Sequence, residues 1–212
     1  MGSTSSYSPV QEMTGISAAA DEHYLPDSIE RSAKILVVGS FGVGKTTLIG
    51  SVSEIAPLRT EELMTTASIG TDDLAGLPDK ETTTVAMDFG RITLTEQTVL
   101  YMFGMPGQRR FWDLWDGLAD GAVGALVLVD TRRLEASFDV LDQLELRGDR
   151  LPFAVAVNVF PNSRRHAAGK VRQALDLLPH TPIVQCDARE RDSSVRALIA
   201  LTEYALAEKG SA

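Results

Sequence analysis

The sequence contains a single cysteine, Cys186, among 212 residues, so no disulfide can form within the chain. Such scarcity is typical of proteins from reducing, intracellular compartments. The sequence also lacks an apolar run of the roughly 18 residues that a membrane-spanning helix needs, and it shows no secretory signal pattern. We therefore expect a cytoplasmic protein with no direct membrane insertion.

Positive charge is scarce as well. The 20 Lys and Arg residues face 29 Asp and Glu residues, which gives a formal net charge of −9. A nucleic-acid-binding surface needs clustered cations to neutralise phosphates, so this balance argues against a nucleic-acid partner. The densest basic stretch, residues 164–172, is interpreted as a solvated helix start.

The chain divides into a polar tail over residues 1–32 and one predicted domain over residues 33–209. Within the tail, residues 10–20 could form a short helix. Strands are predicted over 35–38, 85–94, 98–103, 122–130, 152–159 and 182–186, and helices over 45–55, 109–119, 133–148, 166–177 and 192–208. This alternation predicts an α/β fold, with helices on both faces of a mostly parallel six-stranded sheet that has one antiparallel edge strand. A hairpin is expected at residues 96–97, and a long polar connection at 56–83.

One glycine-rich stretch gives the strongest functional signal. Residues 39–46, Gly-Ser-Phe-Gly-Val-Gly-Lys-Thr, have the spacing of a P-loop and lie between a buried strand and a helix. Backbone N–H groups of such a loop bind phosphates at a helix N-terminus. Lys45 is expected to reach the β- and γ-phosphates, and the Thr46 hydroxyl to bind Mg²⁺. The predicted nucleotide-binding residues of this loop are Gly39, Phe41, Gly42, Val43, Gly44, Lys45, Thr46 and Thr47.

A second motif follows the predicted strand 98–103. Residues 104–108, Gly-Met-Pro-Gly-Gln, keep the second half of the Asp-x-x-Gly-Gln motif of Ras-like GTPases. Gly107 is expected to donate its N–H to the γ-phosphate, and Gln108 to orient the attacking water. Gly104 replaces the aspartate that normally supports the Mg²⁺ shell. Asp130, which ends an apolar strand, either serves as an ATPase-style acid or caps the following turn.

The motif that recognises guanine is incomplete. Ras-like GTPases carry Asn-Lys-x-Asp after the fifth strand, whereas residues 158–161 here are Asn-Val-Phe-Pro. The missing carboxylate is the main discriminator against ATP. Asp187, Ala188 and Arg189 stand where GTPases carry Ser-Ala-Lys, and the Ala188 N–H could still favour the guanine carbonyl. We include Asn158 and these three residues in the predicted nucleotide site and leave GTP and ATP both open.

Three phrases make the chain resemble a known family. Residues 41–47, 84–90 and 103–109 are similar to motifs of MglA-type bacterial Ras-like GTPases, and in particular to the conservon GTPases of actinobacteria. The resemblance spans about residues 33–208. It implies a three-layer Ras-like P-loop fold, a Mg²⁺-dependent GTP/GDP switch, and partnership with roadblock/LC7-type proteins in a sensor-kinase-linked complex that recruits the protein to the inner face of the membrane.

The resemblance also assigns Thr84 to switch I, where it contributes to Mg²⁺ binding and γ-phosphate sensing. The run of three threonines at 82–84 is equally compatible with entry into a strand. On this interpretation Gln108, Lys45 and Thr84 are catalytic, and Thr46 and Thr84 bind the metal. Hydrolysis is expected to be slow, because the bulky Phe41 occupies a position that Ras keeps as glycine.

Other functions and roles stay open at this point. The protein could be a nucleotide-loaded scaffold with negligible hydrolysis, or an ATP-using enzyme that exploits Asp130. Arg109 and Arg110 could supply charge to the transition state or simply be exposed. Trp112 and Trp115 could contact a partner or pack in the core. Apolar residues of the last helix are predicted to be core: Val195, Leu198, Ile199 and Leu206.

Overall fold

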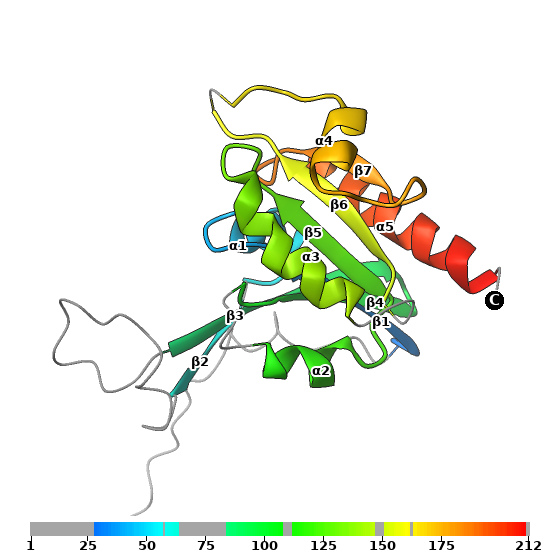
Figure 1. The fold of residues 1–212 in the computed structure, drawn as a ribbon. Helices are drawn as coiled ribbons and strands as arrows, with labels where there is room; N and C mark the ends of the chain where they lie inside the picture. The colour runs from blue at the N-terminus through cyan, green and yellow to red at the C-terminus, as the bar shows by residue number, and fades with distance from the viewer. Residues whose placement is uncertain are drawn as a thin grey trace, which may run out of the picture.

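The computed structural model describes residues 28–56, 58–63, 84–107, 112–146, 151–161 and 163–210. These residues form a seven-stranded sheet of order β2-β3-β4-β1-β5-β6-β7 (Figure 1). The strands are β1 (Arg31–Val38), β2 (Leu58–Leu63), β3 (Thr84–Thr95), β4 (Thr98–Gly104), β5 (Gly124–Val129), β6 (Phe153–Asn158) and β7 (Ile183–Cys186). β3 is antiparallel to both of its neighbours, and all other pairings are parallel. The predicted α/β fold with a mostly parallel sheet is confirmed.

Helices cover both faces of the sheet, which gives three layers (Figure 1). They are α1 (Lys45–Val52), α2 (Asp113–Ala119), α3 (Phe138–Glu145), α4 (Ala168–Ala174) and α5 (Arg191–Gly210), with a 3-10 turn, η4 (Leu134–Ser137), leading into α3. α1 and α5 share one hydrophobic cluster with the sheet, while α2, α3 and α4 share the other. β1 supplies both clusters, because successive side chains of a strand point to opposite faces. Ile35 and Val37 face α1, and Leu36 and Val38 face the opposite layer.

All six predicted strands are present, and the hairpin between β3 and β4 turns at residues 96–97 as expected. β2 was not predicted, since its sequence, Leu-Arg-Thr-Glu-Glu-Leu, has little apolar character. It forms by antiparallel pairing with β3, so β3 lies one strand in from the edge of the sheet. The remainder of the predicted connection, residues 64–83, and residues 1–27 of the predicted tail lie outside the described residues.

The predicted role of α5 needs a correction. Leu198 is buried against the sheet, but Ile199 is 48% exposed and Leu206 is 63% exposed. The buried stripe consists of Ser194, Ala197, Leu198, Leu201 and Ala205. At about 100° per residue, Ile199 and Leu206 lie roughly 125–145° round the helix from the middle of this stripe. In the described part of the chain, no helix combines the length and apolar character needed to cross a bilayer.

Candidate functional site

The P-loop connects the buried end of β1 to the first residue of α1. Gly44 has φ of 109°, a left-handed conformation that favours glycine. A Cβ at residue 44 would lie 2.6 Å from the Asn158 amide nitrogen, so the loop also needs glycine for space. Val43 is fully buried, whereas the Phe41 side chain is 78% exposed. The loop is therefore anchored in the core at one residue and open to solvent at its tip.

The side chain of Lys45 folds back onto the P-loop. Its Nζ donates hydrogen bonds to the carbonyl oxygens of Gly39 (2.8 Å) and Ser40 (3.0 Å). Burial lowers the pKa of Lys45 to about 8, while the negative charge of Asp88 acts in the opposite direction. An ammonium that is half-buried and hydrogen-bonded to neutral loop carbonyls would be further stabilised by a neighbouring anion. This arrangement favours a polyphosphate in the loop.

Thr46 points toward a carboxylate from the neighbouring strand. Its Oγ1 donates a 2.5 Å hydrogen bond to Oδ2 of Asp88, which is buried in β3. Asp88 is paired in register with Gly104, the position at which the usual aspartate is missing. A Cβ at residue 104 would lie 3.0 Å from the Cβ of Asp88. The carboxylate of Asp88 therefore occupies the space beside residue 104, and we regard it as the replacement for the missing acid.

The oxygens of Thr46 and Asp88 fit a hard cation such as Mg²⁺, which prefers oxygen ligands and is usually held by one or two protein groups plus phosphates and water. A closed protein cage is not needed for such a site. No cluster of three or more His, Cys, Asp and Glu side chains with metal-binding geometry occurs among the described residues. Asp88 was not among the predicted site residues, although an isolated carboxylate within an apolar strand opposite Gly104 was a usable signal.

The segment after β4 lies against the P-loop. The N–H of Met105 donates to the carbonyl of Val37 (2.9 Å), which fixes its start to the end of β1. At Gly107 the backbones approach so closely that a Cβ would collide with the carbonyl of Gly39. Gly107 is thus placed beside the first glycine of the loop. Gln108, Arg109 and Arg110 lie outside the described residues.

Asn158 joins three strand ends. Its Nδ2 donates to the carbonyl of Val43 (2.8 Å), and its Oδ1 accepts a bond from the N–H of Ala188 (3.1 Å). The P-loop, the end of β6 and the end of β7 therefore meet at one buried amide. Beside them lies a hollow of about 460 Å³, lined in part by Val159 and Asp187.

Asp187 is engaged by a close neighbour. Its carboxylate accepts bonds from Nε (2.9 Å) and Nη2 (2.7 Å) of Arg189, and these bonds lower the pKa of Asp187. Both side chains are at least partly exposed. Val159 and Pro161 follow Asn158 in the chain and bring neither the lysine nor the aspartate of the guanine motif. Of the Asp187–Arg189 pair, Asp187 lines the hollow.

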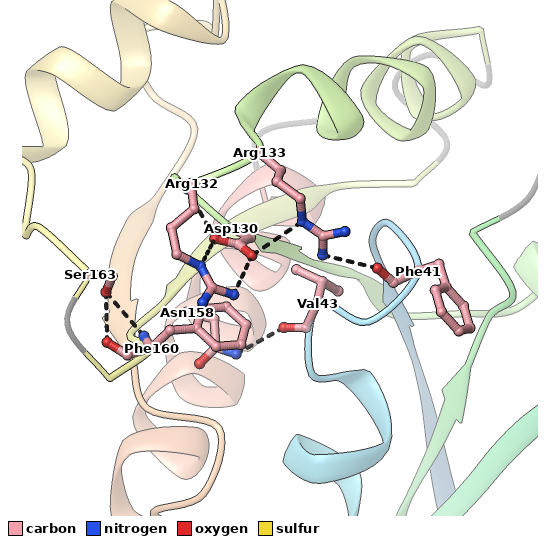
Figure 2. Close-up of polar contacts among 8 residues, drawn as sticks. All are labelled: Phe41, Val43, Asp130, Arg132, Arg133, Asn158, Phe160 and Ser163. Atoms are coloured by element: carbon pink, nitrogen blue, oxygen red, sulfur yellow. Dashed lines mark hydrogen bonds and ion pairs between the residues drawn. The ribbon is translucent and has the colours of Figure 1, made fainter.

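Asp130 organises the loop after β5 (Figure 2). Its carboxylate accepts two bonds from the Arg132 guanidinium (2.9 and 2.7 Å) and one from the Arg132 N–H (3.0 Å). The hydrogen bonds from Arg132 lower the pKa of Asp130. These contacts agree with the capping role. They leave the ATPase-style role without support, because the carboxylate is already paired with a guanidinium.

Arg133 extends from the same loop to the P-loop (Figure 2). Its Nη2 donates to the carbonyl of Phe41 (3.2 Å), and its Nε lies 3.6 Å from Asp130 Oδ2. Arg132 covers the ring of Phe160, with its guanidinium carbon 3.7 Å from the ring centroid. The sequence analysis did not single out Arg133, since nothing in the chain order places it next to residue 41. A cation therefore lies at the open tip of the loop.

The remaining predicted residues are less informative. Thr84 is the first residue of β3 and pairs with Leu63, while Thr82 and Thr83 lie outside the described residues. Thr47 is exposed on α1. Trp115 is fully buried, and its Nε1 donates to the carbonyl of Pro106 (3.3 Å). Of the two roles considered for Trp115, the structure supports the one in the core.

Comparisons with known proteins agree with this geometry. A model of the family described as "conserved hypothetical ATP binding protein" matches residues 37–208. Uncharacterized protein MJ1339 of Methanocaldococcus jannaschii is 27% identical over 127 residues, which cover 59% of this chain and 68% of that protein.

Solved G domains share the fold. The G domain of the T. maritima FeoB iron transporter has a TM-score of 0.53 and 15% identity, covering 82% of this chain and 99% of that one. The FeoB G-domain from Methanococcus jannaschii has a TM-score of 0.54 and 15% identity, covering 83% and 99%. Together with the family match, this likeness leads to one conclusion: the chain belongs to the family of conserved hypothetical ATP-binding proteins, and it has the P-loop fold of a G domain.

Proposed function

We propose that this protein is a Mg²⁺-dependent nucleotide switch that prefers GTP and hydrolyses it slowly to GDP and phosphate. The proposal rests on one observation. The half-buried Lys45 ammonium lies inside the P-loop, while the adjacent Thr46 hydroxyl is bonded to Asp88. A phosphate chain in the loop would give the Lys45 ammonium anionic oxygens as partners, and a charged acceptor attracts an ammonium more strongly than a neutral carbonyl does.

In this proposal each part of the site has one task. The P-loop amides and Lys45 bind the β- and γ-phosphates, and Thr46 with Asp88 holds the metal side of the nucleotide. Mg²⁺ would neutralise charge on the β- and γ-phosphate oxygens. Gly107 would offer its N–H to the γ-phosphate, and Thr84 at the start of β3 would sense it. Order in these two segments would then depend on the γ-phosphate, which is the basis of a switch.

Slow hydrolysis follows from the tip of the loop. Gln108 would orient the attacking water, and the ring of Phe41 would restrict the approach of an arginine supplied by a partner. Arg133, already bonded to the Phe41 carbonyl, provides a cation within the chain. A partner is still expected to control the cycle. The resemblance to MglA-type GTPases makes a roadblock/LC7-type protein in a sensor-kinase-linked complex the first candidate.

ATP is the second candidate nucleotide, and a specific observation favours it. Val159 and Pro161 supply neither of the charged groups that select guanine, and the family description names ATP. The Asp187 carboxylate is already paired with Arg189 and does not decide between the two bases. GTP is the first candidate because the chain has the fold of a G domain and resembles MglA-type GTPases at its phosphate-binding motifs.

The test starts from protein purified under native conditions and then denatured. Chromatography of the released nucleotide is expected to identify guanine nucleotides, with GDP in excess. Single-turnover hydrolysis of GTP should exceed the rate of a Gln108→Ala variant. If ATP or ADP is released instead, the ATP candidate replaces GTP. If both proteins hydrolyse at the background rate, the protein is a nucleotide-loaded scaffold.

A further inference from the structure

A groove of about 290 Å³ runs along α5, on the face of the sheet that also carries α1. Its lining is almost wholly apolar and comes from β1, β3, β4, α5 and Val123, the residue before β5. Three of its side chains are largely open to solvent: Leu94 (53%), Ile199 (48%) and Leu206 (63%). The groove continues the core, since Ile92 and Val195 pack against the buried cluster below α5. Contiguous exposed apolar surface of this kind marks a binding surface.

The N-terminal end of the described chain lies at this groove. Ala33, the third residue of β1, is part of its lining. The N–H groups of Glu30 and Arg31 both donate to the carbonyl of Gln97 (3.0 and 2.9 Å), which ties the entry of β1 to the β3–β4 turn. The 27 residues before Ser28 therefore join the fold within a few residues of Leu94.

The sequence of that N-terminal segment has the signals of an amphipathic helix. Ser8, Pro9 and Gln11 match a helix start, with Ser at the N-cap, Pro at the first position and Gln at the third. Pro26 would end the helix, because the residue before proline is disfavoured in the helical conformation. Apolar side chains recur at spacings of three, three, four and four, and at about 100° per residue they share one face: Val10, Met13, Ile16, Ala20 and Tyr24.

We propose that residues 9–24 form a helix whose apolar face docks into the groove beside α5 of the same molecule. A 16-residue helix is about 24 Å long. The six residues 25–30 that precede β1 can span up to about 20 Å, which allows the end of the helix to reach the groove beside Ala33 and Leu94. A helix of this length is marginal alone in water and gains its stability from burying an apolar face. The covalent link also holds the segment at millimolar effective concentration, which favours it over a second copy of the chain.

The experiment uses the full chain with a nitroxide spin label. Glu22→Cys places a thiol opposite the apolar face of the helix, and the native Cys186 is buried and so protected from labelling. The methyl NMR signals of Leu94, Ile199 and Leu206 are expected to broaden while the nitroxide is paramagnetic, and to recover when the nitroxide is reduced. Leu141, in the cluster on the opposite face of the sheet, should be unaffected. Absence of broadening at the three groove residues would overturn the proposal.

Two controls separate the possible occupants. The first control mixes protein that carries the spin label but no isotopes with protein that carries the isotopes but no spin label, so any broadening must arise between molecules. We expect none. Broadening of the groove signals in this mixture would mean that a second copy of the chain occupies the groove. Met13→Asp with Ile16→Asp is expected to abolish the effect. The matched pair Ala18→Asp with Ala19→Asp, on the polar face, should keep it. Equal broadening in both double variants would contradict docking through the apolar face.

Discussion

Lys45 is a half-buried cation whose charge depends on pH just above neutrality. Burial lowers its pKa to about 8 from the ordinary value of 10.5. Between those two pH values the unfolded chain binds more protons than the folded one, so the empty protein gains stability as pH rises. Nucleotide binding has the opposite dependence, because the phosphates need the charged ammonium.

We therefore expect the affinity for Mg²⁺-GTP to fall about tenfold between pH 7 and pH 9, since roughly nine-tenths of Lys45 is neutral one unit above its pKa. A fluorescent GTP analogue titrated at several pH values measures this. Lys170→Ala removes a lysine that is exposed on α4 and should leave the profile unchanged. A flat or rising profile in the unmodified protein would show that the ammonium does not hold the phosphates.

The proposed role of Asp88 can be tested by moving its carboxylate to residue 104 on the paired strand. Gly104→Asp alone would bring a second carboxylate against Asp88, with its Cβ 2.9 Å from Cδ1 of Ile49. Asp88→Gly alone removes the partner of Thr46. Each single variant is expected to lose roughly 10- to 100-fold in Mg²⁺ affinity, as is usual for groups that orient metal ligands.

The double variant, Asp88→Gly with Gly104→Asp, should recover most of that loss. The measurement is the Mg²⁺ concentration that half-saturates nucleotide binding, with folding checked by circular dichroism. If the double variant binds Mg²⁺ no better than the worse single variant, Asp88 does not replace the missing acid.

The sequence was sufficient to predict the P-loop, because its spacing is local and lies between a buried strand and a helix. The contacts of Asn158 with Val43 and Ala188 needed the structure, since they join three strand ends over 115 and 30 positions of chain. The same holds for Arg133, whose role depends on which loops are neighbours at the edge of the sheet. Asp88 differs, because it lies opposite Gly104 in a hairpin that the sequence predicts.

At the scale of elements, α2 connects the segment after β4 to the core through Trp115. This side chain is fully buried and donates to the Pro106 carbonyl. Trp115→Ala is expected to lower the free energy of unfolding by about 3–5 kcal/mol, as is typical for large aromatic side chains in cores. Trp112 packs against the same cluster but is only half-buried, so Trp112→Ala should cost less.

Urea unfolding followed by circular dichroism compares these two variants directly. A larger loss for Trp112→Ala than for Trp115→Ala would contradict the packing of α2. The same comparison shows why amphipathic spacing alone was ambiguous here. Two tryptophans three positions apart share a helix face, and only the position of the neighbouring layer decides which one is enclosed.

Burial also determined how well the sequence predicted the bounds of strands and the buried faces of helices. Strands with continuous apolar runs, such as β5 and β6, were predicted nearly in full because both of their faces are buried. β2 is polar and depends on a partner strand, so its pattern gave no signal. On α5 the apolar residues extend over more than one stripe, and the sequence does not reveal which stripe faces the sheet. That choice is fixed by the packing of α5 against the sheet and α1.

At the scale of the whole molecule, the order of strands explains why the site lies where it does. The P-loop leaves the carboxyl end of β1, the central strand of the sheet, and the ends of β4 and β6 contribute Gly107 and Asn158 beside it. In open parallel sheets ligands bind at the carboxyl ends of the strands, where such loops converge. The alternation of strands and helices predicted this arrangement. The motifs themselves did not predict the distances between residues of different motifs.

Ligand binding should accordingly stabilise the entire domain. Mg²⁺-GTP at 100 times its dissociation constant is expected to add about 2.7 kcal/mol to the free energy of unfolding. For a chain of this size that corresponds to a rise of roughly 5–10 °C in Tm. Thermal unfolding with and without Mg²⁺-GTP measures this, and an unchanged Tm at saturating nucleotide would contradict it.

Nucleotide binding as a whole depends on the P-loop and its lysine. Titration calorimetry of nucleotide-free protein with Mg²⁺-GTP, compared with the Lys45→Ala variant, tests this most directly. We expect clear binding to the unmodified protein and a loss of at least about 100-fold in the variant, since a charged partner of the phosphates is removed. Equal affinities, with both proteins folded, would show that the phosphates are bound elsewhere.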